Sequence, residues 1–326
     1  MRRRKFISLL GGTVIAWPSC SSADGVGKVW RVGIVTGSGS AADQAVKELE
    51  RRLGDLGYVR DKNIIIVTQH SEPNLQSYEN AIASLLPTSD LLVVTGTLGG
   101  VAAKKLVTAK PVVFISVGAP VDIGLVESLS RPGGNLTGIT FEAATETYAK
   151  RLQILKEIMP KLNRVAVLQA RDDANVKFAM ASLERAAPDL GVQLSPIAFS
   201  ASGDIAGAFD EMKRGQSEAL IVIAGLLTLA NGQQIADLAL AHHLPSCHAF
   251  RETVAMGGLV SLGPDILAMW GQAAGYVDKI IRGTEPRELP VQQPTRYQLA
   301  INLKTAEALG LNLPQSLVTR ADVVIE

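Results

Sequence analysis

From Arg31 onward, short apolar runs rich in β-branched residues alternate with amphipathic helical segments. Continuous apolar strands separated by helices are typical of parallel sheets that helices cover on both faces. The alternation therefore predicts an α/β protein. The predicted strands span 31–36, 63–68, 90–95, 111–116, 137–141, 164–169, 192–198, 218–223 and 258–262, and helices between them include 41–57, 74–86, 145–159, 173–187 and 229–243.

About nine strand units are more than one doubly wound sheet usually holds, and 326 residues suffice for two domains. We therefore expect two doubly wound parallel-sheet lobes joined by a hinge. The Pro/Gly-rich stretch at 130–138 interrupts the pattern and marks the boundary, and "SLGPD" at 261–265 marks a return. The expected division is an N-terminal lobe of 30–138 plus about 265–285, a C-terminal lobe of 139–264, and a tail of 286–326 packing across the lobes.

The N-terminus has the layout of a secretory signal peptide. Four basic residues, Arg2 to Lys5, precede the apolar stretch "FISLLGGTVIAW" and the small residues "SCSSA". Cleavage after Ala23 would give a signal peptide of residues 1–23. The order Arg3-Arg4-x-Phe6 also resembles a twin-arginine signal, which would export a folded protein.

Removing that peptide takes away four of the 32 basic residues and none of the 31 acidic ones, so the mature chain carries a net charge of −3. No basic run with interleaved aromatic residues occurs, which argues against nucleic acid as a partner. Lipid attachment at Cys20 is the less favoured alternative, because the preceding Trp17, Pro18 and Ser19 make a poor lipobox. Cys247 is expected to be a buried small hydrophobe.

The loop after the first predicted strand spells G-x-G-x-x-A with Gly37, Gly39 and Ala42, a pattern that dinucleotide-binding folds use to hold a pyrophosphate. Such folds also place an acidic residue at the end of the second strand to bind the ribose. Here that position holds Gln69, His70 and Ser71. The missing acid argues against a nucleotide cofactor.

Hydroxyl groups and bare backbone follow three neighbouring strands. The loops carry Thr36 and Ser38, then Gly96 and Thr97, then Ser116. Neutral donors at helix N-termini can hold a small anion such as a carboxylate without a counter-charge. The alternative is that each hydroxyl simply caps a helix. We predict that these five residues bind a ligand.

In the second lobe, Phe141 and Glu142 follow one strand, Asp172 and Asp173 another, and Gly225 a third. A carboxylate at 142 or 172 could receive a ligand ammonium while Phe141 covers an apolar face. The alternative is again a helix cap or a solvated charge. We add Phe141, Glu142 and Gly225 to the predicted ligand-binding residues.

Catalytic and metal motifs are absent from the sequence. No Gly-x-Ser-x-Gly elbow occurs, and no cysteine and histidine cluster has metal-ligand spacing. We therefore expect no enzyme activity, no cofactor and no metal.

Several blocks resemble the ABC-transporter substrate-binding proteins of the tryptophan/tyrosine-type family, which have the type I periplasmic-binding-protein fold. They include "RPGGNLTG" at 131–138, "FRETVAMGGLVSLGPD" at 250–265 and "LPVQQPT" with "INLKTA" in the tail. The resemblance implies a periplasmic protein that captures a small-molecule solute between two lobes by hinge closure, acts as a monomer and delivers the solute to an inner-membrane ABC permease.

Two positions depart from the usual pattern of that family. Leu262 stands where a Tyr is common, and Gly225 stands where an Asp is common. Together with an aromatic content of 5%, they argue against an aromatic amino acid as the solute. An amino acid or another small carboxylate-like molecule stays the expected class. The alternatives are a periplasmic ligand sensor for a membrane receptor and, more remotely, a nucleotide-dependent α/β enzyme.

Overall fold

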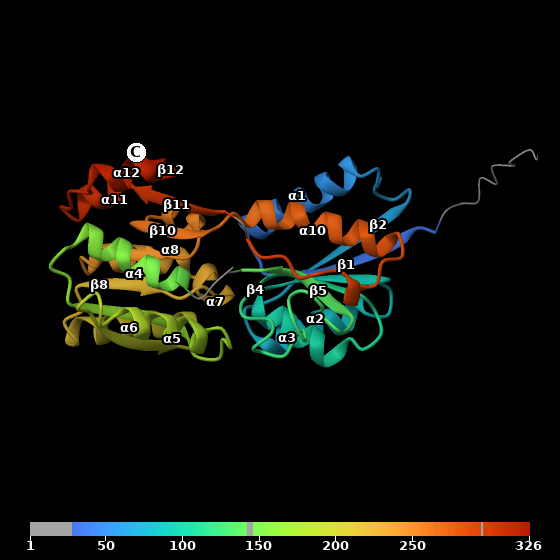
Figure 1. The fold of residues 1–326 in the computed structure, drawn as a ribbon, viewed down its shortest axis with the longest axis horizontal. Coiled ribbons are helices and arrows are strands. Elements are labelled where there is room, and N and C mark those ends of the chain that lie inside the picture. Colours follow the sequence, from blue (N-terminus) through green and yellow to red (C-terminus); the bar gives the residue numbers. More distant parts are fainter. Residues whose placement is uncertain (1–27, 142–145, 295) are drawn as a thin grey trace, which may run out of the picture.

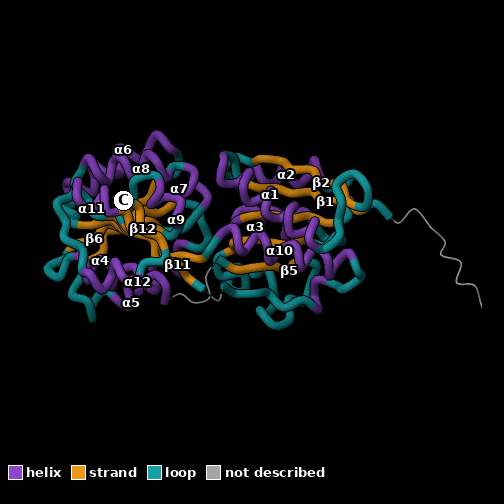
Figure 2. The backbone as a smooth tube through the Cα atoms, turned by 90° about the horizontal axis from the view of Figure 1, so that it is seen from above, coloured by secondary structure: helices purple, strands orange, loops and turns teal. Residues whose placement is uncertain are grey.

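The computed structural model describes residues 28–141, 146–294 and 296–326 and shows two α/β lobes side by side (Figure 1). The expected signal peptide, Cys20 and Glu142 lie outside the described residues. Figure 2 shows the lobes from above as separate groups of strands, each with helices around it. The α/β architecture with two sheets confirms the predicted fold class.

The first lobe contains a five-stranded sheet in the order β2-β1-β3-β4-β5, with every pairing parallel. Its strands are β1 (Trp30–Thr36), β2 (Ile64–His70), β3 (Leu91–Thr95), β4 (Val112–Val117) and β5 (Leu136–Thr140), and its helices are α1 (Ser40–Asp55), α2 (Leu75–Leu85), α3 (Gly96–Leu106) and α10 (Ile266–Ile281).

Alternate residues of the inner strands of this sheet enter two different cores. In β3, Leu91 and Val93 pack with α1 and α10, whereas Leu92 and Val94 pack with α2 and α3. Helix α10 comes from far along the chain and lies beside α1 (Figure 1). Burial on both faces explains the continuous apolar runs in the sequence.

The second lobe contains a seven-stranded sheet in the order β12-β11-β10-β9-β8-β6-β7. Helices α4 and α5 pack on one face and α6 and α8 on the other. The strands are β6 (Arg164–Ala170), β7 (Gln193–Phe199), β8 (Ala219–Val222), β9 (Ser246–His248), β10 (Val260–Pro264), β11 (Tyr297–Asn302) and β12 (Val323–Ile325); the α-helices are α4 (Glu146–Ile158), α5 (Val176–Ala186), α6 (Ile205–Arg214), α7 (Leu226–Ala230), α8 (Gly232–Ala241), α9 (Arg251–Ala255), α11 (Leu303–Ala308) and α12 (Gln315–Arg320). Short 3₁₀ turns occur at Ser202–Asp204 and Pro286–Glu288.

Two features of the second lobe differ from the sequence prediction. The predicted helix 229–243 is two helices, α7 and α8, which meet at Asn231. The sheet is not wholly parallel, because β11 runs antiparallel to β10. The tail therefore completes this sheet, and its residues Leu299 and Ile301 enter the core that α4 covers.

The chain passes between the lobes in three places. The first passage follows β5, which pairs with β4 up to Thr140, so the first sheet extends two residues beyond the expected boundary at 138. The second lies between β10 and α10. The third follows Gln292, which is bridged to Ile139 at the edge of the first sheet before the tail enters β11.

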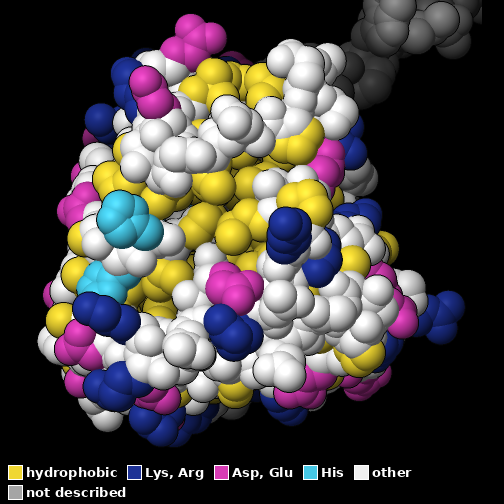
Figure 3. All heavy atoms as spheres, turned by 90° about the vertical axis from the view of Figure 1, so that its left-hand side faces the viewer, with side chains coloured by type: hydrophobic (Ala, Val, Ile, Leu, Met, Phe, Trp, Pro, Cys, Tyr) yellow, Lys and Arg dark blue, Asp and Glu magenta, His cyan; other side chains and the backbone are white. Residues whose placement is uncertain are grey.

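Figure 3 shows the end of the second lobe that faces away from the first, where hydrophobic side chains gather between charged ones. Large exposed hydrophobic side chains elsewhere include Leu56, Val59 and Val67 on the first lobe. Within the described part of the chain, no helix combines the length and the apolar character that crossing a membrane requires.

Candidate functional site

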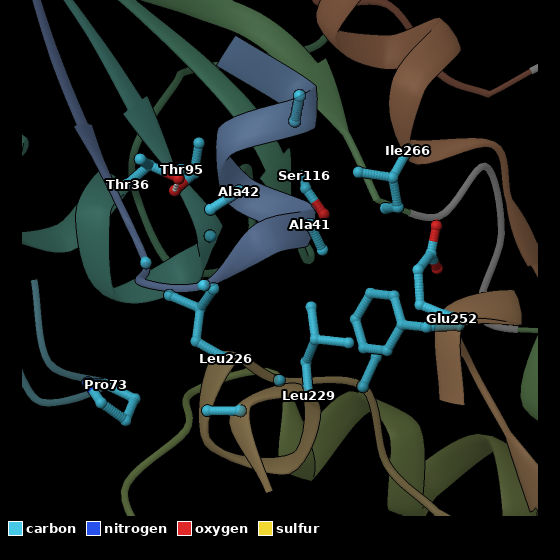
Figure 4. A pocket seen from close by; sticks show the side chains of 18 of the residues that line it. Thr36, Ala41, Ala42, Pro73, Thr95, Ser116, Leu226, Leu229, Glu252 and Ile266 are labelled. Carbon is cyan, nitrogen blue, oxygen red and sulfur yellow. Dashed lines mark hydrogen bonds between the residues drawn. The ribbon is translucent and has the colours of Figure 1, made fainter. Parts of the chain in front are cut away.

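A cavity of about 510 Å³ lies between the two lobes. The loops after β1, β3 and β4 and the start of α10 form its first-lobe wall. The loops after β6 and β8 and the start of α9 form its second-lobe wall. Parallel strands place their carboxyl ends at one edge of a sheet, and ligands bind at that edge in α/β folds. Side chains of both lobes converge on the cavity (Figure 4).

The first-lobe wall contains a group of buried hydroxyls. Thr36 and Thr95 end adjacent strands, and Thr95 Oγ1 donates to Thr36 Oγ1 over 3.2 Å. Ser71 Oγ and Tyr78 OH are also buried at this wall, and neither has a hydrogen-bond partner among the described residues. A buried polar atom left unpaired costs free energy. These two hydroxyls are therefore available to a ligand or to water.

Helices α1 and α3 both begin at this wall. Their N-cap residues, Gly39 and Thr95, make no side-chain capping hydrogen bond. The first N–H groups of a helix have no partner within it, and the helix dipole favours an anion there. Thr97 braces the wall, because its Oγ1 accepts a hydrogen bond from Gly118 N over 3.3 Å. The wall as a whole offers donors without a formal positive charge.

Ser116 sits in a strained backbone position at the cavity. Its φ of +62° lies in the left-handed region, and the pairing of β4 with β5 shifts register between Ile115 and Val117. A bulge of this kind redirects a side chain. Figure 4 shows Ser116 among the side chains that line the cavity. Non-glycine residues in this conformation cluster at functional sites.

On the second-lobe wall, Asp173 and Asn175 follow β6. The Asp173 carboxylate accepts a hydrogen bond from Asn175 N over 2.9 Å, yet burial raises the pKa of Asp173 to about 6. Asn175 Nδ2 donates to Tyr148 OH over 3.2 Å, and the same hydroxyl accepts from Ala224 N over 3.3 Å. Tyr148 of α4 thus joins the loops after β6 and β8. Gly225 leaves room for Asp173, because a Cβ there would lie 2.7 Å from Asp173 Oδ2.

A second carboxylate, Glu252, projects from the first turn of α9. Its Oε1 is 3.5 Å from Nε of Arg251. Its Oε2 is buried and has no hydrogen-bond partner within the described ranges. In Figure 4 the carboxylate points toward Ile266 on the other lobe. An unpaired carboxylate oxygen at a cavity is suited to accept from a ligand ammonium.

Apolar side chains fill the space between these polar groups. The rings of Phe141 and Phe250 lie 5.1 Å apart at 50°. Leu229 of α7 and Ile266 of α10 pack against this pair. The cavity is lined by four aromatic residues, Tyr78, Phe141, Phe250 and Trp270. The low aromatic content of the whole chain therefore did not indicate the character of the cavity.

Seven of the eight predicted ligand-binding residues line this one cavity: Thr36, Ser38, Gly96, Thr97, Ser116, Phe141 and Gly225. Ser38 is exposed at its edge, and Thr36 and Thr97 are buried. The eighth, Glu142, lies outside the described residues. Direct contact of the seven with a solute stays a prediction.

The sequence analysis missed Ser71, Tyr78, Phe250 and Glu252, which also line the cavity. Phe250 and Glu252 were not predicted, because the strand that precedes them, β9, has only three residues and was not recognised. Had that strand been recognised, the sequence "FRE" after it would have marked both. Tyr78 offered no signal, since it lies inside a helix.

The structure gives the dinucleotide motif a different role. His70 ends β2, where a ribose-binding acid would stand, and its Nδ1 lies 2.9 Å from the carbonyl oxygen of Gly37. Its Nε2 lies 3.5 Å from Asp43. The histidine thus fastens the glycine loop to α1. No group of three or more potential metal ligands occurs among the residues described.

Residues 32–325 match the family of ABC transporter substrate binding proteins. The tyrosine-binding protein of Clostridioides difficile is 24% identical over 82% of this chain and 77% of its own length. A conserved domain protein from Vibrio cholerae, solved by crystallography, is 26% identical, with a TM-score of 0.85 over 91% of this chain and 100% of that one.

A Streptococcus pneumonia ABC domain in complex with L-Trp gives the same TM-score at 21% identity, over 91% of this chain and 99% of that one. A type I periplasmic binding protein from Bordetella pertussis also shares the fold. The family match spans nearly the whole described chain. The protein is a member of the ABC transporter substrate-binding protein family.

Proposed function

We propose that the solute is an α-amino acid with an apolar side chain. The observation that carries this proposal is that helix starts and buried hydroxyls line the first-lobe wall, whereas the carboxylates of Asp173 and Glu252 line the second-lobe wall beside Arg251. Uncapped helix starts and unpaired hydroxyls of Ser71 and Tyr78 suit a carboxylate. The carboxylates of Asp173 and Glu252 suit an ammonium group.

The apolar surface between the walls would take the side chain of the amino acid. Phe141, Phe250, Leu229 and Ile266 form one cluster there. The relatives support the same class, since one is a tyrosine-binding protein and another was solved with L-Trp. Because four aromatic residues line the cavity, an aromatic amino acid is again a candidate for the solute.

The bound solute would touch both lobes and so favour a closed arrangement about the three chain passages. The protein would be exported by its signal peptide, act as a monomer in the periplasm and present the closed, loaded form to an inner-membrane ABC permease. This assignment rests on family membership and on a cavity that both lobes share.

A thermal-shift screen of amino acids tests the solute class. Each apolar amino acid is paired with the amine that lacks its carboxylate and with the acid that lacks its ammonium. A ligand at 100 times its dissociation constant should add about 2.7 kcal/mol to the free energy of unfolding. We expect the intact amino acid alone to shift the melting temperature.

Equal shifts by the deaminated acid would remove Asp173 and Glu252 from the recognition. The absence of any shift across the twenty amino acids, with a folded protein, would contradict the proposed class. Isothermal titration calorimetry then gives the dissociation constant of each positive compound.

A further inference from the structure

Leu226 belongs to the second lobe but packs into the first. It is the first residue of α7, which follows β8 of the second sheet. Its side chain nevertheless packs against the first-lobe core that contains Val35, Tyr78 and Val94. Figure 4 shows it beneath the loop that joins β1 to α1. The two lobes therefore touch through an apolar side chain at one end of the cavity.

Two glycines of the first lobe, Gly96 and Gly37, face the Leu226 side chain. A Cβ at Gly96 would lie 2.6 Å from Leu226 Cδ1, and a Cβ at Gly37 would lie 4.0 Å from Cδ2. Gly96 also has a φ of +71°, which favours glycine in any case. Any larger residue at 96 would push Leu226 out, so bare backbone is what allows the lobes to approach here.

Leu229 of the same short helix provides a contrast. It lines the same cavity. Its apolar partners, however, are Phe141, Phe250 and the other members of the cluster beside the chain passages, and it is absent from the first-lobe core. That cluster also contains Ile266 of α10, so Leu229 lies near the first lobe too, but among the side chains beside the chain passages. Leu226, by contrast, packs into the first-lobe core itself.

We propose that Leu226 is a closing contact that favours the closed arrangement before any solute binds, and that it limits which solutes fit by covering Gly96 at the start of α3. Part of the free energy that a solute would otherwise supply for closure comes from this burial of apolar surface. A solute group that must reach Gly96 would have to displace the Leu226 side chain. The inference rests on the proposed hinge closure and not on the identity of the solute.

Distance measurements between the lobes without solute test this directly. Spin labels at Gln76→Cys on α2 and Gln234→Cys on α8 report one exposed site on each lobe. Cys20→Ser removes the thiol of the N-terminal segment, and Cys247 is buried. Double electron-electron resonance then gives the ratio of short to long separations. We expect Leu226→Ala to shift this ratio about tenfold toward the long separation.

Leu240→Ala, at an exposed position of α8 outside the cavity lining, is the matched control and should leave the unliganded ratio within about twofold of the wild-type value. Leu226→Met, which keeps the length and apolar character, should restore the short separation. Leu226→Gln, with a polar end, should behave as Leu226→Ala does and provides a second test if the alanine variant is poorly folded.

Identical distance distributions for the wild type, Leu226→Ala and Leu226→Gln would overturn the inference, as would an equal shift caused by Leu240→Ala. Failure of the proposed function would look different. In that case amino acids would not alter the distances in any variant, while the effect of Leu226 in the unliganded protein would persist.

Discussion

Among the residues that line the cavity, Ser116 has a backbone conformation that lowers the stability of the folded protein. A non-glycine residue in the left-handed region costs about 1 to 2 kcal/mol. Ser116→Gly should relieve that strain, offset in part by the larger entropy of glycine in the unfolded chain. We expect the free energy of unfolding to stay within about 1 kcal/mol of wild type while solute affinity falls about tenfold through loss of a hydrogen bond.

Ser116→Ala is the matched control, since it keeps the strain and loses only the hydroxyl. Both variants should bind equally weakly in calorimetry, whereas urea unfolding should show the glycine variant to be the more stable. Wild-type affinity in either variant would show that the hydroxyl does not contact the solute.

Asp173 should make the protein less stable as the pH rises. Its pKa is about 6 in the folded protein and 3.8 when unperturbed, because burial disfavours the carboxylate. Between pH 4 and 6 the folded state binds more protons than the unfolded state, so stability falls as pH increases. We expect Asp173→Asn to raise the free energy of unfolding at pH 7 by about 1 to 2 kcal/mol and to weaken binding of an amino acid.

His248 opposes this trend over nearly the same range. Burial lowers its pKa from 6.5 to about 4, so its contribution to stability is lost as the pH falls from 6.5 toward 4. Urea unfolding of Asp173→Asn between pH 4 and 7 should therefore show a steeper loss of stability toward acid than wild type does. Parallel pH profiles for the two proteins would mean that Asp173 is not perturbed.

Residues at strand ends were the ones that the sequence could predict. Thr36, Thr97 and Ser116 follow long apolar runs, and parallel strands bring such positions to one edge. Contacts that join distant segments leave no local pattern. The hydrogen bonds of Tyr148 OH with Asn175 and Ala224 connect three elements, and they depend on how α4 packs on the sheet.

At the scale of elements, strand position was predictable and strand direction was not. The apolar runs located β1 through β8 and β10 within a few residues. The antiparallel direction of β11 was not predicted, because hydrophobic periodicity does not show in which direction a strand runs. Strand β9 escaped because three residues are too few to show a period, although its Cys247 is wholly buried.

The second lobe illustrates how an element far along the chain can complete a core. Ile301 of β11 is fully buried with residues of α4 and β6, more than 130 positions earlier. The pairing of β11 with β10 also covers an edge that would otherwise be open. The tail is thus part of the second lobe from Tyr297 onward, and only its beginning, near Gln292, lies along the first sheet.

The whole molecule consists of two lobes that each have their own cores and are joined by three chain passages and a few side-chain contacts at the cavity, so the lobes should be separable by mutation. Ile301→Ala should cost the second lobe about 2 to 5 kcal/mol, because it leaves a cavity in a closed core. The first lobe keeps every residue of its own two cores. We expect the second lobe to unfold at a lower urea concentration than the first.

Two spectroscopic signals can follow the unfolding of the two lobes separately. Trp30 in β1 and Trp270 in α10 both belong to the first lobe, and Trp17 lies in the expected signal peptide. Tryptophan emission of the processed protein therefore reports on the first lobe, whereas far-ultraviolet circular dichroism reports on both. In Ile301→Ala the dichroism should begin to fall before the emission changes.

Val324→Ala is the control at a half-exposed position of the same sheet, and its two transitions should stay as close together as in wild type. A solute that binds both lobes stabilises only the state in which both are folded. Adding it to Ile301→Ala should therefore draw the two transitions together. Coincident transitions in Ile301→Ala without solute would mean that the lobes unfold as one unit, and that the passages couple them more strongly than their separate cores suggest.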